Sequence, residues 1–442
     1  MRILYFILKL TLNYTLRVFY PRLKLHNSPK HFFGRTIYVS NHPASFMDPI
    51  SIAALRRPIV FFMTRSDVFT PIAKPFLWAC QMLPIYRIRD GQESLGKNAR
   101  VFRRSANVLK YGRGLLIFGE GFTDDVFIRR LKPVKKGPAR IAFTALDNLN
   151  WEKKVYMVAV GANYSNPNQI RSDYLISHSE RFCLNDYEQL YKENPNKAMT
   201  EVTRRIEKLM QEQITHVEDK NLAPFHENIM KLTRKGMNAD NFDRSIGLKA
   251  RWRYSQALAN WLNEQNIGEN EALAKLKDDT EGYFKLLKRF RLQERILFWK
   301  IQNPSGSRAK EVLKMIVLFP FAIAGVLHLG LPYILVKKWA EKSFRRKVFW
   351  GSVKLVAGKI LMGLMNIPAI FLFYHFVFPS YWLALLYYVL IGLFGVAAYE
   401  WGLALRDFKL KGIINKADIR KFAKKRENLM NQIGEVLPVE LR

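Results

Sequence analysis

Two long apolar segments near the C-terminus constrain the fold more than any other feature of this sequence. Met315 to Ile334 contain no Lys, Arg, Asp or Glu, and Leu355 to Leu405 are almost wholly apolar apart from a break at Phe378-Pro379-Ser380. A helix needs about 20 apolar residues to cross a bilayer, so the second segment is long enough for two crossings joined by a tight turn. The sequence therefore predicts a helical hairpin embedded in a membrane.

The first apolar segment is harder to assign, because basic residues flank it on both sides. The connector that follows it, residues 335–354, holds seven Lys or Arg and one Glu, and the segment before Met315 is also basic. Basic connectors stay on the cytoplasmic side of a membrane. We therefore expect a re-entrant or interfacial element at 315–334, in which Pro320 and Pro332 interrupt a straight helix; a third membrane span is the alternative.

The formal net charge of +34 indicates an anionic partner. Residues 1–150 carry 25 Lys and Arg against 8 Asp and Glu, whereas residues 191–300 are nearly neutral. Nucleic acid, an anionic membrane surface and a phosphorylated substrate all fit such an excess. The apolar hairpin favours the membrane and no recognised nucleic-acid-binding motif occurs, so we expect anionic lipid rather than nucleic acid. Cys80 and Cys183 provide no disulfide framework, which indicates a reducing, cytosol-facing environment.

Composition divides the chain into five parts. Met1 to Tyr20 are rich in Ile, Leu, Phe and Tyr but lack a small-residue cleavage site, which favours an uncleaved interfacial helix over a signal peptide. The expected parts are this N-terminal helix within 1–29, an α/β domain at 30–190, a charged helical region at 191–311, a membrane-embedded region at 312–405 and a basic cytoplasmic tail at 406–442.

The second of these parts alternates between short β-rich runs and helical stretches. The expected strands are Thr36–Val39, Ile59–Met63, Met82–Tyr86, Leu115–Phe118 and Val155–Val160. Helical stretches such as Ile50–Leu55 and Lys97–Tyr111 separate them, and from about residue 190 the pattern is mainly helical. We predict an α/β fold, a mixed sheet with flanking helices, plus a helical insert and a C-terminal membrane-embedded helical region.

Polar residues follow several of these strands, at the edge where sheets of this kind bind ligands. After the first strand, His42 and Asp48 would form a general base and its orienting carboxylate, the pair needed to take a proton from an attacking hydroxyl. In one helix six residues are about 240° from alignment, so the intervening loop must bend back. Pro49 suits the first helical position, which would make Asp48 the N-cap. The alternative interpretation is a loop histidine beside an ordinary cap.

Basic side chains after the third strand and around a later helix start would bind a phosphate. The group consists of Arg87, Arg89, Lys135, Lys136 and Arg140, the last three around Gly137-Pro138. Arginine and lysine hold phosphate by charge-assisted hydrogen bonds, and a helix N-terminus adds backbone N–H donors. For each of them a solvated surface position is the alternative. After the fourth strand, Glu120 stands between two glycines, where it either reaches the substrate or braces the loop.

Other catalytic motifs are incomplete or missing from the sequence. Residues 91–98 match a phosphate-binding P-loop except at the last position, where Asn98 replaces the hydroxyl residue that contacts Mg²⁺. Neither a Gly-x-Ser-x-Gly elbow nor a His-Glu-x-x-His zinc site occurs. These observations weigh against nucleotide hydrolysis, serine-hydrolase and zinc-protease chemistry, and we expect no metal site or bound cofactor.

Four ordered blocks carry a family resemblance. They are Ser40-Asn41-His42-Pro43-Ala44-Ser45-Phe46-Met47-Asp48-Pro49, Leu83-Pro84-Ile85-Tyr86-Arg87, Ile117-Phe118-Gly119-Glu120-Gly121 and the strand that ends at Gly161. As a set they resemble the glycerolipid acyltransferases, membrane enzymes that acylate glycerol 3-phosphate or lysophosphatidic acid. The similarity covers roughly residues 30–185, and the ordered set is far more specific than any single block.

The resemblance implies an acyltransferase catalytic domain at 30–190, with His42 as the general base and Asp48 as its partner. Its motifs imply three substrate-binding residues, Arg87, Glu120 and Gly121. The basic group described above adds Arg89 and Lys136 as further substrate-binding candidates. Arg87 would bind the phosphate, and Glu120 with Gly121 would line the glycerol-binding wall. Two departures concern the acceptor: five residues rather than the common four separate the His from the Asp, and Gly119 and Phe122 replace the Pro and Thr of the usual Phe-Pro-Glu-Gly-Thr.

The function expected from this resemblance is a membrane-bound O-acyltransferase of phospholipid biosynthesis. It would move a fatty acyl group from acyl-CoA or acyl-ACP, both co-substrates, to a hydroxyl of 1-acyl-glycerol 3-phosphate and form phosphatidic acid. Glycerol 3-phosphate is the alternative acceptor, and a non-catalytic, membrane-anchored protein that binds anionic lipid is the alternative of another class. We expect a membrane location, the inner membrane in a bacterium, with the catalytic domain in the cytoplasm and acyl carrier protein as a partner where it is the donor.

Overall fold

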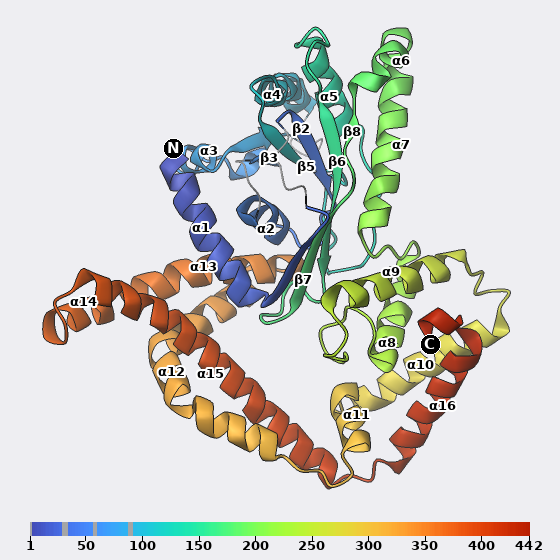
Figure 1. Ribbon diagram of the computed structural model, residues 1–442, viewed down its shortest axis with the longest axis vertical. Coiled ribbons are helices and arrows are strands. Elements are labelled where there is room, and N and C mark those ends of the chain that lie inside the picture. The colour runs from blue at the N-terminus through green and yellow to red at the C-terminus, as the bar shows by residue number, and fades with distance from the viewer. Residues whose placement is uncertain (1, 29–33, 56–59, 87–91) are drawn as a thin grey trace. The chain divides into compact units, whose positions relative to one another are not determined.

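The computed structural model describes residues 2–28, 34–55, 60–86 and 92–442 (Figure 1). The chain divides into two compact units. The first contains the residues up to Ala223 and takes in Gly247–Asn263, and the second contains Pro224–Ile246 and Glu264–Arg442. The five-part division expected from composition stays a prediction.

The first unit is built on a mixed sheet, as predicted, which has eight strands in the described part of the chain. The strands are β1 (Arg22–His26), β2 (Thr36–Ser40), β3 (Val60–Arg65), β4 (Met82–Ile85), β5 (Gly114–Phe118), β6 (Tyr156–Tyr164), β7 (Asp173–His178) and β8 (Phe182–Cys183). They lie in the order β1-β7-β6-β2-β5-β3-β4, and β8 pairs with β6. β7 and β8 run antiparallel to β6, whereas the other neighbours are parallel. The five predicted strands are confirmed, and β1, β7 and β8 add to them.

Helices cover both faces of this sheet. Those of the first unit are α1 (Arg2–Phe19), α2 (Met47–Leu55), α3 (Lys74–Ala79), α4 (Gln92–Lys110), α5 (Gly137–Asp147), α6 (Glu188–Glu193), α7 (Pro195–Gln213) and α9 (Leu248–Glu264). Met157 and Ala159 of β6 join residues of α4, α5 and α7 in one buried apolar core. Because side chains alternate along a strand, Tyr164 of β6 points to the opposite face, where it meets Ser51 of α2.

A glycine in β6 allows α7 to end against the sheet. A Cβ atom at Gly161 would stand 2.0 Å from the carbonyl oxygen of Gln213 and 2.5 Å from Ser177 Oγ. Gln213 is the last residue of α7, and its carbonyl accepts hydrogen bonds from Ser177 Oγ at 2.5 Å and from Asn163 Nδ2 at 2.9 Å. The absence of a side chain at Gly161 is therefore a packing requirement, because any larger residue would displace the helix end.

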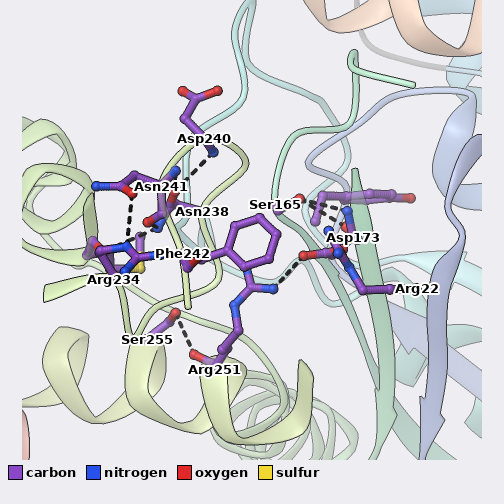
Figure 2. Close-up of polar contacts among 12 residues, drawn as sticks. Arg22, Ser165, Asp173, Arg234, Asn238, Asp240, Asn241, Phe242, Arg251 and Ser255 are labelled. Carbon is purple, nitrogen blue, oxygen red and sulfur yellow. Dashed lines mark hydrogen bonds and ion pairs between the residues drawn. The ribbon is translucent and has the colours of Figure 1, made fainter. Parts of the chain in front are cut away.

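A buried ion cluster joins three elements of the first unit (Figure 2). Asp173, at the start of β7, is fully buried and pairs through its two oxygens with Arg22 of β1 and Arg251 of α9, the latter at 2.7 Å. Its backbone N–H donates to Ser165 Oγ at 2.8 Å. Arg251 is itself almost completely buried. Asp173 and Arg251 have lost their water and depend on each other, whereas the Arg22 side chain is 42% exposed. The buried pair therefore ties α9 to the sheet.

The second unit is helical in the described residues. Its elements are α8 (Ala223–Thr233), α10 (Glu271–Arg289), α11 (Glu294–Gln302), α12 (Ala309–Ser343), α13 (Trp350–Met365), α14 (Ile367–Phe376), α15 (Tyr381–Asn415) and α16 (Arg420–Val436). Three helical stretches are long and apolar enough to cross a membrane: Ala309–Ser343, Lys347–Phe376 and Tyr381–Asn415. The last two lie on either side of Phe378-Pro379-Ser380, where the hairpin turn was predicted, but the earlier stretch is divided into α13 and α14 at Asn366, and α15 packs mainly along α12.

The helix break expected at Pro320 and Pro332 is wrong, because α12 is one continuous helix of 35 residues through both prolines. The re-entrant or interfacial placement stays a prediction. The alternative, a third stretch long enough to span, fits this helix. Gly325 of α12 lies against the backbone of α15: a Cβ atom there would stand 2.1 Å from the carbonyl oxygen of Phe394. The small residue lets the backbones of two apolar helices approach closely, as is common for helix pairs in membranes.

A polar cluster connects the three long apolar stretches. His328 of α12 bonds through Nδ1 to Asn366 Oδ1 at 2.8 Å and through Nε2 to the Tyr387 hydroxyl of α15 at 3.0 Å. Asn366 stands between α13 and α14, and its amide nitrogen donates to the carbonyls of His328 and Met362 at 3.1 and 2.8 Å. These bonds satisfy backbone and side-chain groups that hydrocarbon would leave without a partner.

Candidate active site

The His42–Asp48 pair lies in the loop that follows β2 and in the first turn of α2. His42 Nδ1 and Asp48 Oδ2 are 2.9 Å apart, so the loop does bend back and the two side chains meet. The side chain of Asp48 is fully buried, whereas that of His42 is 20% exposed. A histidine that contacts both a buried carboxylate and solvent has the arrangement required of a general base.

The helix begins earlier than predicted, at Met47 rather than Pro49, so Asp48 is not the N-cap. Backbone bonds from Met47 N to Ala44 O and from Asp48 N to Ser45 O, at 3.1 and 3.2 Å, start the helical turn inside the loop. Ser45 has a φ of 52°, the left-handed conformation that closes this turn. The Asp48 carboxylate reaches back and accepts the Ala44 N–H at 2.9 Å, which holds the loop over the helix start.

Hydrogen bonding determines which nitrogen of His42 is the base. An ionised carboxylate only accepts hydrogen bonds, so Nδ1 carries the proton donated to Asp48 and Nε2 carries the lone pair. The imidazole stacks on Phe118, the last residue of β5, with ring centroids 4.2 Å apart. Burial raises the pKa of Asp48, while the hydrogen bond and charge of His42, the Ala44 N–H and the Tyr164 hydroxyl act to lower it. The donors thus offset part of the cost of keeping this carboxylate ionised.

Glu120 braces the base from the backbone side. Its Oε1 accepts the N–H of His42 at 2.8 Å, and its Oε2 lies 3.4 Å from Lys132 Nζ, which also lies 3.2 Å from Asp124. Glu120 is 2% exposed; burial raises its pKa, and the Lys132 charge is the main opposing influence. The recorded bonds of Glu120 therefore support the bracing interpretation, and its contact with substrate stays a prediction.

The glycines beside Glu120 allow the turn that presents it. Gly121 has a φ of 77°, which an L-residue rarely adopts, and its N–H donates to the Phe118 carbonyl at 3.3 Å. Gly119 donates its N–H to Ser40 O at 3.2 Å. Proline, the usual residue here in the resembled family, has no N–H and could not make this bond. The departure at Gly119 thus ties the end of β5 to the end of β2, next to Phe118, on which the base stacks.

The residues predicted to bind phosphate are only partly placed. Arg87 and Arg89 lie outside the described residues. Lys136 is exposed and directly precedes α5, whose start at Gly137 with Pro138 in the first turn is confirmed. The P-loop-like segment is helical from Gln92 onward as part of α4, so its described part is not a loop that cradles a phosphate.

Several residues of the site were missed by sequence reasoning. Tyr164 donates its hydroxyl to Asp48 Oδ1 at 2.9 Å. The side chain of Asn41 pairs with the backbone of Ala162 in both directions, at 2.8 and 3.2 Å, and so fixes the start of the loop to β6. Lys132 is buried against Glu120. The polar end of β6 was a signal for Tyr164, but no spacing in the sequence pointed to Asp48 as its partner.

Comparison with known proteins agrees with this geometry. Residues 22–162 match the family model described as Acyltransferase. The chain carries an acyltransferase domain of the glycerolipid acyltransferase family. The match covers less than half of the chain, and it contains His42, Asp48 and Glu120. No significant match was found among curated proteins.

Proposed function

We propose that this protein transfers a fatty acyl group from acyl-CoA or acyl-ACP to the free hydroxyl of 1-acyl-glycerol 3-phosphate and forms phosphatidic acid in phospholipid synthesis. The observation that carries the proposal is the His42–Asp48 pair, in which Nδ1 is bonded to a fully buried carboxylate at 2.9 Å. The acyltransferase domain at 22–162 supports the reaction type.

The proposed mechanism is a direct transfer. His42 Nε2 takes the proton of the acceptor hydroxyl as its oxygen attacks the thioester carbonyl, and the Asp48 charge stabilises the imidazolium that forms. The tetrahedral intermediate collapses, the carbon–sulfur bond breaks, and the sulfur leaves as a thiol after it takes the proton back from His42. No covalent acyl-enzyme is needed. Positioning two substrates can supply about 7–11 kcal/mol in well-oriented systems.

The acceptor phosphate would bind basic residues near the end of the sheet that holds the base. Arg87, Arg89 and Lys136 are the candidates from the sequence. Lys132 is a weaker one, because Glu120 and Asp124 lie within 3.4 and 3.2 Å of its ammonium. A cation already paired with two carboxylates has little remaining charge to offer a phosphate.

The membrane is the proposed site of action because the acceptor and the product are lipids and the transferred acyl group is a fatty chain. Three helices long enough to cross a bilayer are consistent with membrane association. The basic segment before Met315 and the basic tail from Arg406 would stay on the cytoplasmic side, which would place the catalytic domain in the cytoplasm and, in a bacterium, at the inner membrane.

The decisive experiment supplies the purified full-length protein, in lipid nanodiscs, with labelled acyl-CoA or acyl-ACP. Lysophosphatidate and glycerol 3-phosphate are offered separately, and the lipid product is identified by mass. We expect phosphatidic acid from lysophosphatidate. Product from glycerol 3-phosphate alone would identify the alternative acceptor.

Replacing His42 with Ala is the matched test of the base. We expect turnover to fall by at least about 100-fold, since general-base catalysis typically contributes 10²–10⁴. Near-normal turnover of the correctly folded variant would refute the assignment. If neither wild type nor variant transfers an acyl group while both bind anionic vesicles equally, the non-catalytic lipid-binding alternative is favoured.

A further inference from the structure

The Asp48 carboxylate is held on both oxygens. Oδ2 accepts His42 Nδ1 and the Ala44 N–H, both at 2.9 Å, and Oδ1 accepts the Tyr164 hydroxyl at 2.9 Å. The Tyr164 bond comes from β6, whereas His42 and Ala44 are in the loop that also leads to Asp48. Tyr164 therefore links the catalytic loop to the rigid centre of the sheet.

The Tyr164 ring has little freedom to move. It is fully buried and stacks on Tyr174 of β7, with ring centroids 4.1 Å apart and an interplanar angle of 2°. Tyr20 packs against both rings, with centroids 5.7 and 5.3 Å away. Arg129 donates to the Tyr164 carbonyl at 2.6 Å and fixes the backbone behind the ring. Because the ring is held in this way, the Tyr164 hydroxyl fixes the position of Asp48 Oδ1, which accepts its hydrogen bond.

The Tyr164 hydroxyl is the donor in its bond to Asp48, because an ionised carboxylate only accepts hydrogen bonds. Ser51 donates to the Asp48 carbonyl at 3.0 Å, so its oxygen is available as an acceptor for the Tyr174 hydroxyl at 2.7 Å. Burial raises the pKa of Tyr164 well above its usual value, and the nearby Asp48 charge raises it further. Tyr164 thus stays protonated and donates a hydrogen bond to the carboxylate.

We propose that Tyr164 is a positioning residue for acyl transfer: through its hydroxyl it fixes the Asp48 carboxylate, so that His42 presents Nε2 to the acceptor. This role rests on the proposed function. It differs from a packing role because it depends on one oxygen atom rather than on the ring. Removing that oxygen leaves the stack on Tyr174 in place and frees one side of the carboxylate.

The test compares Tyr164→Phe with Tyr20→Phe in the full-length protein in nanodiscs. Tyr20 is a matched control, because it is fully buried in the same aromatic cluster and its hydroxyl bonds to Pro167 O at 3.0 Å rather than to Asp48. Both variants lose one buried hydroxyl, so we expect similar losses of thermal stability. Only Tyr164→Phe should lower kcat, by about 10- to 150-fold, the value of a hydrogen bond to a charged group. KM for both substrates should stay within about twofold, because Tyr164 does not contact them.

The pH profile provides a readout that packing would not change. The hydrogen bond from Tyr164 lowers the pKa of the Asp48 carboxyl, so its loss raises that pKa. Protonated Asp48 is no longer the negative partner of the imidazolium, so the acid limb of kcat/KM should move to higher pH in Tyr164→Phe and not in Tyr20→Phe.

The two proposals fail in different ways. If wild type transfers acyl groups, His42→Ala does not, and Tyr164→Phe matches Tyr20→Phe in both kcat and acid limb, the positioning role is refuted and the acyltransferase function stands. If wild type shows no transfer with any donor or acceptor offered, the proposed function fails, and the positioning role fails with it.

Discussion

Replacing Asp48 with Asn separates the charge of the carboxylate from its hydrogen bonds. Asp48 Oδ2 accepts two N–H donors, from His42 and from the backbone of Ala44. An amide nitrogen in that place would face the Ala44 donor directly, so the amide oxygen should occupy it. The amide nitrogen then points to the Tyr164 hydroxyl, which can accept it and turn its own proton toward Ser51 Oγ, 3.4 Å away.

In this orientation His42 keeps the proton on Nδ1 and loses only the negative partner of its imidazolium. A hydrogen bond to a charged group contributes about 1.5–3 kcal/mol, which corresponds to a fall in kcat of about 10- to 150-fold. The opposite orientation would make Nδ1 an acceptor and put the proton on Nε2. In the Ser-His-Asp triad the same substitution costs about 10⁴ because the tautomer is wrong. The Ala44 N–H should therefore limit the loss in Asp48→Asn.

The assay is kcat by thiol release at saturating donor and acceptor, with His42→Ala as the baseline. A kcat within about threefold of wild type would refute a role for the Asp48 charge, and a fall of about 10⁴ would refute the orientation imposed by Ala44. The effect of Asp48→Asn on thermal stability serves as a control, because its direction follows from the pKa of Asp48. Burial raises the pKa of Asp48, so its ionisation opposes folding as the pH rises through its folded pKa. Asp48→Asn should thus unfold at no lower temperature than wild type at pH 8.

Two further substitutions test the bracing and packing. Lys132→Met removes the main charge that opposes the raised pKa of buried Glu120, so the folded-state pKa of Glu120 should rise further and its ionisation should cost the fold more as the pH rises through that pKa. We expect the free energy of unfolding to fall by about 3 kcal/mol at pH 8 and by less at pH 5. A loss that does not depend on pH would contradict this. Gly161→Ala places a methyl 2.0 Å from Gln213 O and should lower the free energy of unfolding, measured by chemical denaturation, by about 3 kcal/mol or more. Gly137→Ala is the control, because nothing is recorded within 4 Å of a Cβ atom there, and it should change stability by less than about 0.5 kcal/mol. Equal effects would refute the close approach at Gly161.

The sequence predicted the parts of the site that lie close together along the chain. His42 and Asp48 are six residues apart, and residue type together with local geometry was enough to pair them. Tyr164 is 116 residues from Asp48. Its place beside the carboxylate depends on the register of β6 against β2, which pairs Ser40 with Val160, and no single-sequence pattern contains that register.

The same limit explains the strands that were not predicted. β7 is buried along its whole length but contains Asp173, Ser177 and His178, so its sequence does not read as an apolar run. Partners elsewhere in the fold make those polar residues tolerable, as Arg22 and Arg251 do for Asp173. The error at 315–334 has another cause, because proline is a stronger helix breaker in water than in a helix that neighbouring apolar helices support.

The Asp173 cluster determines where the catalytic part of this protein can be cut. The family match ends at residue 162, yet the carboxylate at Asp173 and its partner Arg251 both lie beyond it, and the chain leaves the first unit at Ala223 before α9 returns. A fragment that stops at the end of the match would lack both Asp173 and Arg251, and one that stops between Asp173 and α9 would leave the buried Asp173 carboxylate without Arg251. The chemistry occupies a contiguous stretch of sequence, but the unit that folds around it does not. An attempt to produce the first unit without the three long apolar helices should therefore retain Gly247–Asn263 and replace residues 224–246 with a linker.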